Sequence, residues 1–193
     1  MSEKTTSSRV SVDRKVIKAA FTLARELGWE TVTLKDISDE SGISLSEMRN
    51  YFDDKTDILV QYNKQLDKKV LASVSGQNEP VRDQLFEILM ERFDLLNEDR
   101  ESLKAILSSF KRDPKQVLLS WPHLCRSMSW ILEAVGEDTR GIKGAMKVAG
   151  LSGVYLKTLK AWIEDDSVDM AATMAALDKS LKTADEWVGR IPI

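Results

Sequence analysis

The residues best able to do chemistry lie in one short segment of the chain. Residues 121–130 hold the only histidine, His123, the only cysteine, Cys125, two tryptophans and a proline. Residues two apart on a helix point to different faces, so these two do not pair as nucleophile and base, and no third residue orients them. They are also too few for a tetrahedral metal site. Two interpretations remain: a core helix broken or kinked at Pro122, or the wall of an apolar ligand pocket.

No other segment carries an enzymatic signature. HExxH, P-loop and paired Glu-x-x-His motifs are absent from the sequence, so we expect a binding protein with no catalytic residue, metal or cofactor. The single cysteine excludes a disulfide framework, and no apolar run approaches the roughly 20 residues that span a bilayer. One thiol and no secretory leader predict a cytoplasmic protein.

The charge of the chain is nearly balanced. Its 193 residues carry 28 basic and 31 acidic side chains, for a net charge of −3. This balance argues against a protein that coats nucleic acid by bulk electrostatics. The 42% of hydrophobic residues is typical of a soluble globular protein, and the length allows one large domain or two small ones.

Apolar residues recur at three- and four-residue spacing along almost the whole chain, which predicts an all-α protein. Residues 1–12 are polar and are predicted to form a flexible arm. Thr33 caps a predicted helix that ends at Gly42, and Ser44 with Glu47 forms a capping box for the next one. The predicted helices cover residues 13–27, 34–41, 45–51, 54–71, 81–96, 100–111, 138–164 and 167–187, with a break near 122.

The two short helices joined at Gly42 have the dimensions of a helix-turn-helix. The second helix of such a motif must be short and exposed on one face to enter a major groove about 12 Å wide. The first helix holds it at a fixed angle through an apolar corner. Suitable corner residues are Leu34, Ile37, Ile43, Met48 and Phe52.

The same region resembles the TetR family of regulators over residues 14–62. The run at 19–37 is similar to the family's alanine-rich helix, Gly-aromatic step and Thr-capped helix, and Ser41-Gly42-Ile43-Ser44 is similar to its turn. Tyr51-Phe52, Lys55 and Leu59 resemble the signature that follows the recognition helix. The resemblance implies a helix-turn-helix DNA-binding domain over residues 1–52 and a helical ligand-binding and dimerisation domain over residues 53–193.

A set of residues is expected to face DNA if the resemblance holds: Thr33, Lys35, Ser44, Leu45, Ser46, Glu47, Arg49, Asn50, Tyr51 and Lys55. Leu45 stands where the family usually has a basic residue, so a phosphate partner is lost. Glu47 directs a carboxylate toward the groove, and Arg49 and Asn50 are expected to compensate as guanine and adenine readers or as phosphate clamps. The expected phosphate contacts are Lys35, Arg49 and Lys55, with Lys4 and Arg9 of the arm as further candidates. Residues 1–75 carry 12 basic and 12 acidic side chains, whereas a DNA-reading domain is usually positive.

The remainder of the chain holds the candidate ligand pocket and dimer interface. By resemblance the pocket lies among residues 85–160, and our candidates for its lining are Phe93, Phe110, Trp121, His123, Trp130 and Tyr155. The last helix repeats apolar residues in an alternating four- and three-residue pattern, which is typical of a coiled-coil seam. We assign this seam to a dimer interface rather than to the intrachain core: Met170, Met174, Leu177 and Leu181, with Gly150 allowing close helix approach. A ligand lying against the backbone is the alternative explanation for Gly150.

The sequence therefore predicts a ligand-responsive DNA-binding transcriptional regulator. It would act as a repressor and a homodimer on a pseudo-palindromic site in double-stranded DNA, and a small apolar ligand would release it. The alternative is a TetR-fold accessory protein that binds a lipid or isoprenoid and has lost DNA binding, for which a ubiquinone-biosynthesis protein of that fold is the precedent. Leu45, Glu47 and the neutral charge of residues 1–75 motivate this alternative.

Overall fold

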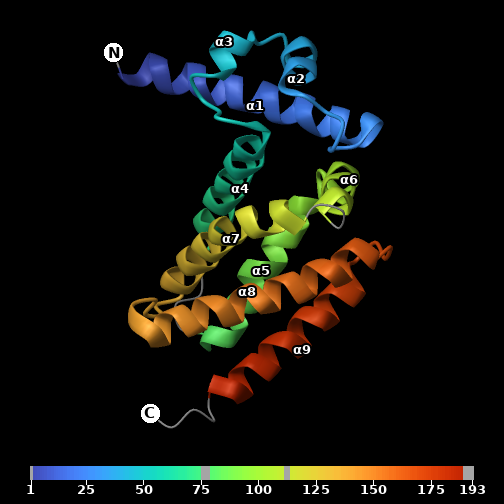
Figure 1. The fold of residues 1–193 in the computed structure, drawn as a ribbon. Helices are drawn as coiled ribbons and strands as arrows, with labels where there is room; N and C mark the ends of the chain where they lie inside the picture. The colour runs from blue at the N-terminus through green and yellow to red at the C-terminus, as the bar shows by residue number, and fades with distance from the viewer. Residues whose placement is uncertain (1, 75–78, 111–113, 189–193) are drawn as a thin grey trace. The chain divides into compact units, whose positions relative to one another are not determined.

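The computed structural model describes residues 2–74, 79–110 and 114–188, with side chains placed for residues 9–74, 79–110 and 120–186 (Figure 1). The prediction of an all-α protein is confirmed, because every regular element in these ranges is a helix. The helices are α1 (Ser2–Leu27), α2 (Leu34–Ser41), α3 (Leu45–Met48), α4 (Lys55–Ala72), α5 (Val81–Asn97), α6 (Arg100–Phe110), α7 (Pro114–Ala134), α8 (Gly141–Glu164) and α9 (Ala171–Val188).

The chain divides into two compact units. The N-terminal unit contains Met1–Leu66 and Leu96–Leu118, and the C-terminal unit contains Asp67–Leu95 and Leu119–Ile193. The first boundary therefore lies inside α4, later than the expected division at residue 53. The reason is that Ile58 and Leu59 of α4, and Ile106 of α6, are buried in the same core as the helix-turn-helix.

Helix α1 provides one side of the core of the N-terminal unit. Its residues Val16 and Phe21 are buried, and the Phe21 ring lies 4.7 Å from the Tyr62 ring of α4, centre to centre. The predicted apolar corner is confirmed: Leu34 packs against this core, and the other four members are buried within it. Burial of this corner fixes the angle between α2 and α3.

The predicted ends of α2 are also confirmed. The Thr33 hydroxyl accepts a hydrogen bond from the Asp36 amide at 3.2 Å, and the Asp36 carboxylate accepts one from the Thr33 amide at 2.9 Å, which completes a capping box. Gly42 ends the helix in the left-handed region at φ 68°. The Ser44 hydroxyl caps α3 by accepting from the Glu47 amide at 3.2 Å.

Three expected boundaries differ from the structure. Helix α1 begins at Ser2, so the backbone of the expected arm at 1–12 is helical from residue 2 onward. Helix α3 ends at Met48, and residues 49–51 form a turn. Helix α7 continues through Pro122, so of the break or kink expected there the break is absent. A proline removes only one backbone donor, and burial of Met128 and Ile131 anchors the helix after it.

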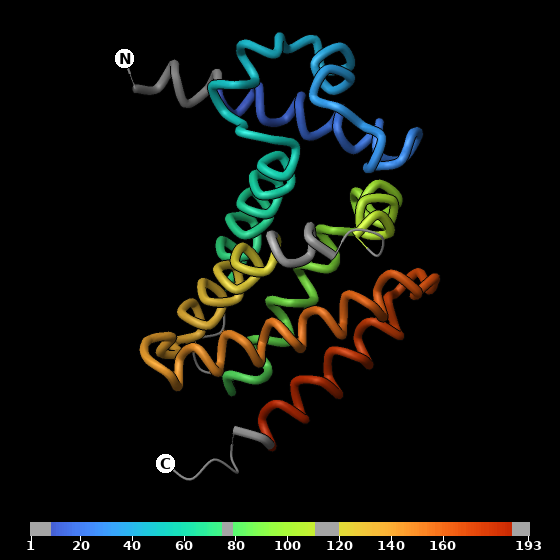
Figure 2. The backbone as a smooth tube through the Cα atoms, in the orientation of Figure 1, coloured from blue at the N-terminus to red at the C-terminus, as the bar shows by residue number. Residues whose placement is uncertain are grey.

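In the C-terminal unit α8 and α9 pack side by side, as the backbone trace shows (Figure 2). Their connection is fixed by the buried Asp165, whose carboxylate accepts hydrogen bonds from the Thr173 amide and hydroxyl, each at 2.7 Å. Further hydrogen bonds come from Ser167, and the hydroxyls and amides together hold the pKa of Asp165 well below its usual range. The carboxylate therefore joins the end of α8 to the first turn of α9.

This packing of α9 on α8 uses part of the predicted dimer seam. Met170, Leu177 and Leu181 are buried inside the C-terminal unit, where α9 packs on α8. Only Met174, which is 43% exposed, and Gly150 of α8 are left on the surface. A four- and three-residue pattern needs one partner helix, and α8 of the same chain supplies it.

Candidate functional site

The helix-turn-helix presents the expected surface around a very short recognition helix. In α3 the side chain of Met48 points into the core, while Leu45 is 44% exposed and Ser46 is exposed. Arg49 and Asn50, in the turn that follows, are exposed as well. The fold thus brings the predicted base-reading residues together on one surface.

Two of the three phosphate contacts predicted within residues 33–57 are neutralised within this surface. The Lys35 ammonium forms an ion pair with Asp39, and the Arg49 guanidinium forms one with Asp53. Both pairs join residues four apart, and the hydrogen bond to Asp53 raises the pKa of Arg49. Exposed pairs of this kind contribute little stability, so their effect is to cancel charge rather than to hold the fold.

The third predicted phosphate contact, Lys55, is engaged in the loop between α1 and α2. Its ammonium donates to the carbonyl oxygens of Trp29 at 2.7 Å and Val32 at 3.0 Å. It also lies 5.0 Å from the centre of the Trp29 ring, which is a cation–π distance. Burial lowers the pKa of Lys55. In this structure Lys55 holds the loop, which was not predicted from the sequence.

The charge around α2 and α3 is strongly acidic. Residues 33–57 contain three basic side chains, Lys35, Arg49 and Lys55, and seven acidic ones, so the net charge of this segment is −4. The acidic residues are Asp36, Asp39, Glu40, Glu47, Asp53, Asp54 and Asp57. Because phosphate neutralisation supplies most non-specific affinity for DNA, this segment opposes the approach of a duplex.

The C-terminal unit brings together some of the predicted pocket residues. The rings of Phe93 and Tyr155 are stacked with their centres 5.4 Å apart, and Trp162, which was not predicted, lies 6.4 Å from Phe93. Trp121 and Trp130 are exposed and His123 is half-buried. Phe110 belongs to the other unit and packs on its core.

A buried polar network lies beside these rings. The fully buried Arg92 guanidinium forms an ion pair with Asp67, and the Ser127 hydroxyl donates to the same carboxylate at 2.7 Å. The guanidinium also lies 5.4 Å from the centre of the Tyr155 ring. Burial acts to lower the pKa of Arg92, but Tyr155 and Asp67 outweigh it and raise the pKa. The sequence carries a signal for this site, since Arg92 falls on the apolar face of α5 between Leu89 and Phe93.

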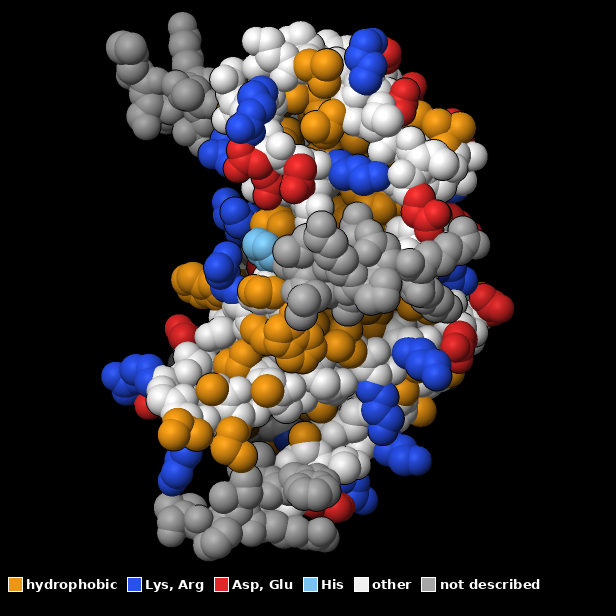
Figure 3. Space-filling view, viewed as in Figure 1, with side chains coloured by type: hydrophobic (Ala, Val, Ile, Leu, Met, Phe, Trp, Pro, Cys, Tyr) orange, Lys and Arg blue, Asp and Glu red, His pale blue; other side chains and the backbone are white. Residues whose placement is uncertain are grey.

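Large apolar side chains are exposed on α7 and α8. Trp130 is 57% exposed and Ile142 is 83% exposed, and Met146 and Leu156 are exposed as well. Hydrophobic side chains gather on the face over α8 (Figure 3). Gly150 lies on the same helix, and a Cβ atom added there would meet no atom within 4 Å. Packing within the chain therefore does not explain Gly150.

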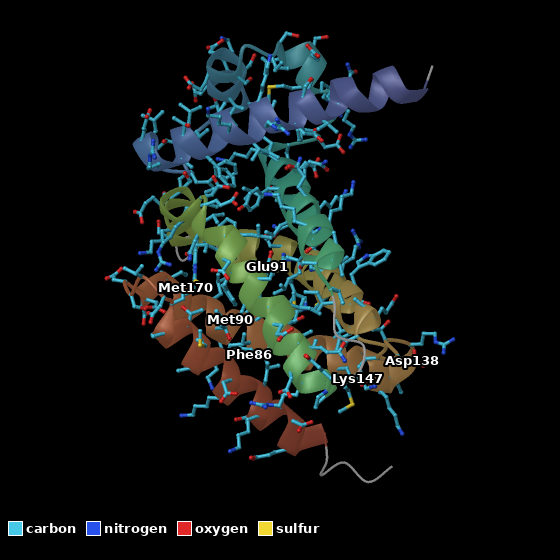
Figure 4. The ribbon with its side chains drawn as sticks, turned by 180° about the vertical axis from the view of Figure 1, so that it is seen from behind. Phe86, Met90, Glu91, Asp138, Lys147 and Met170 are labelled. Atoms are coloured by element: carbon cyan, nitrogen blue, oxygen red, sulfur yellow. The ribbon has the colours of Figure 1, made fainter. Side chains whose placement is uncertain are left out.

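The turn between α7 and α8 forms a polar pocket of about 340 Å³, lined by Glu133, Gly136, Glu137, Asp138, Thr139 and Arg140. The Arg140 side chain donates to Asp138 and lowers the pKa of that carboxyl to about 2. Lys147 of α8, which with Asp138 is marked in Figure 4, donates to Glu137 at 2.6 Å. With its charges paired in this way, the pocket does not match an apolar ligand.

In the described part of the chain, no three His, Cys, Asp or Glu side chains are grouped to hold a metal ion. Across the same residues, no helix combines the length and the apolar character needed to cross a membrane.

Several solved structures with a similar arrangement of helices are TetR transcriptional regulators. The TetR transcriptional regulator from Nitrosomonas europaea ATCC 19718 is 21% identical over 90% of this chain and 98% of its own, with a TM-score of 0.70. A TetR transcriptional regulator from Rhodococcus sp. RHA1 is 14% identical over 92% and 97%, with a TM-score of 0.63. This chain has the TetR-like fold. The resemblance seen in the first 62 residues is thus confirmed at the level of the fold.

One family model matches part of the TetR-like chain. The COQ9 model matches residues 117–187, which cover α7 from its second turn, α8 and almost all of α9. No curated protein matches the sequence. The family match therefore falls in the part of the chain that carries most of the exposed large apolar side chains among the described residues.

Proposed function

We propose that this protein is a TetR-fold accessory protein that binds an isoprenoid or another apolar lipid and no longer reads DNA. The observation that carries the proposal is the net charge of −4 over residues 33–57. Lys35 and Arg49 are each paired with a carboxylate, and Lys55 is bound to carbonyl oxygens. DNA binding by a helix-turn-helix depends on the neutralisation of phosphates by cations, so such a surface has a low affinity for DNA.

The C-terminal unit supports lipid binding through its composition. Ligand sites for apolar molecules combine many apolar and aromatic contacts with a few placed polar groups. Trp130, Ile142 and Met146 supply exposed apolar surface, and Tyr155 combines an aromatic ring with the Arg92 network. The COQ9 match over this region agrees with the accessory-protein function. The function is binding rather than catalysis, which the likeness to regulator structures supports.

Native mass spectrometry of the full chain, purified without detergent, tests this proposal. We expect each protomer to carry one lipid-sized mass that organic solvent extracts, or to take up an added short-chain isoprenoid quinone. The double variant Met146→Ser/Leu156→Ser should lower the bound fraction severalfold. Val168→Ser is the matched control, since Val168 is equally apolar and fully exposed on the loop before α9. A wild-type protein that carries no lipid and takes up no quinone contradicts the proposal.

A second candidate is the ligand-responsive homodimeric regulator. It is favoured by one observation: Ser46, Arg49 and Asn50 remain exposed together on the recognition surface. In this function Gly150 and Met174 would lie at the dimer interface, and ligand binding would shift the spacing of the two recognition helices. Fluorescence anisotropy with DNA from upstream of the protein's own gene would show salt-sensitive binding, and Arg49→Ala would weaken it by about 1–3 kcal/mol.

A further inference from the structure

Helix α1 carries a stripe of basic side chains on its outer face. Arg14, Lys15, Lys18 and Arg25 are all exposed, and their spacing places them on one side of the helix. The opposite side of α1 is the buried one, which carries Val16 and Ala20 into the core. From the first to the last residue this basic stripe spans about 16 Å.

The charges of the basic stripe are available to a partner. None of its four side chains forms an ion pair or a side-chain hydrogen bond with any described residue. The one acidic residue between positions 9 and 25 is Asp13, which is buried and accepts a hydrogen bond from the Gln61 side chain at 2.7 Å. The basic stripe thus differs from Lys35 and Arg49, whose charges are paired.

The position and composition of the basic stripe favour one kind of partner. It lies on the side of α1 away from the buried face that packs on α2 and α6. Protein interfaces are centred on aromatic and apolar anchors and are poor in lysine. The described residues between the four cations offer no large exposed apolar side chain, and the exposed Val10 and Leu27 of α1 lie beyond the two ends of the stripe. A helix face with spread charge and no central anchor fits an extended anionic surface.

We propose that the basic stripe of α1 docks the protein on an anionic phospholipid surface through the headgroup phosphates. This inference rests on the proposed function, because a protein that carries an apolar lipid must meet the bilayer. Within the N-terminal unit the stripe is positive and residues 33–57 are negative. This asymmetry turns α1 toward an anionic bilayer and the helix-turn-helix away from it. Each lysine or arginine near such a surface strengthens binding about fivefold.

Vesicle co-sedimentation with the full chain tests the inference. The probes are vesicles of phosphatidylcholine with about one third phosphatidylglycerol, and vesicles of phosphatidylcholine alone. We expect at least a fiftyfold preference for the anionic vesicles at 0.1 M NaCl and its loss at 0.5 M NaCl. Arg14→Glu/Lys18→Glu should reduce binding more than tenfold. The control Lys64→Glu/Lys68→Glu changes exposed cations at the same spacing on α4 and should reduce it less than threefold.

Three results would overturn the inference. They are equal binding to both kinds of vesicle, equal losses in the two double variants, and loss of duplex DNA binding in the α1 variant with vesicle binding intact. Circular dichroism establishes that both variants are folded. The lipid carried by the purified protein is measured in the same samples. A failed vesicle test with lipid still bound overturns the docking surface alone, whereas absence of lipid contradicts the proposed function.

Discussion

The ion pair between Arg92 and Asp67 should be the most costly polar contact to break in the C-terminal unit. The Arg92 side chain is 1% exposed and that of Asp67 is 17% exposed, so little water can replace either partner. Removing one partner of a buried pair costs about 3–5 kcal/mol, because the remaining charge stays buried. We therefore expect Asp67→Asn to lower the free energy of unfolding by that amount. For a chain of this size the melting temperature should fall by about 6–20 °C.

Urea unfolding followed by circular dichroism measures this loss, with thermal unfolding as a second readout. The control is Asp39→Asn, which breaks an exposed ion pair and should cost less than about 0.5 kcal/mol. The double variant Asp67→Leu/Arg92→Met removes both charges and should lie within about 2 kcal/mol of the wild type. If the free energy of unfolding of Asp67→Asn lies within about 1 kcal/mol of the wild-type value, the prediction is wrong, because the buried charge of Arg92 is then not stabilised by Asp67.

Three further predictions concern the stability of the fold and the charge of the helix-turn-helix. At pH 7, Asp165→Asn should cost about 2–3 kcal/mol in urea unfolding, since it weakens hydrogen bonds that a carboxylate accepts. Because the pKa of Asp165 is lowered in the folded state, its carboxylate adds to the free energy of unfolding above about pH 4, and this stabilisation is lost as the pH falls further. An Asp165→Asn variant that is equally destabilised at pH 7 and pH 2 would contradict this prediction. Gly42→Ala should cost about 1–2 kcal/mol in thermal unfolding because φ there is 68°, and an unchanged melting temperature would count against it. Asp39→Asn/Asp53→Asn frees Lys35 and Arg49 to pair with phosphates. In anisotropy titrations with duplex DNA, the logarithm of the binding constant should then fall more steeply with the logarithm of the salt concentration, by about 2 per protomer. A change below 1 would show that Lys35 and Arg49 stay out of reach of phosphate.

Features set by neighbours in sequence were predictable. The Thr33 cap with Asp36 and the glycine at the end of α2 follow from local hydrogen bonding and backbone geometry, and the structure contains both. The pair Lys35–Asp39 also has a sequence signal, because residues four apart on a helix meet. The pair Arg49–Asp53 has no such signal, since it forms beyond the end of α3.

Features set by distant segments were not predictable. Lys55 donates to carbonyl oxygens more than 20 residues earlier in the chain, and no local pattern shows where those carbonyls lie. The apolar pattern of α9 was real, but spacing alone does not show whether Leu177 meets a helix of the same chain or of a second copy. The structure assigns Leu177 to the intrachain core. The Asp67–Arg92 pair joins α4 to α5 and likewise depends on the tertiary fold.

The acidic surface over residues 33–57 is proposed to have lost the ability to read DNA. Selection from a pool of random-sequence duplexes by the purified full chain tests it most directly, because no operator has to be known beforehand. At 50 mM salt, where charge-driven binding is stronger than at physiological salt, we expect no sequence to be enriched over the input pool. Enrichment of a pseudo-palindromic motif that Arg49→Ala abolishes would contradict it.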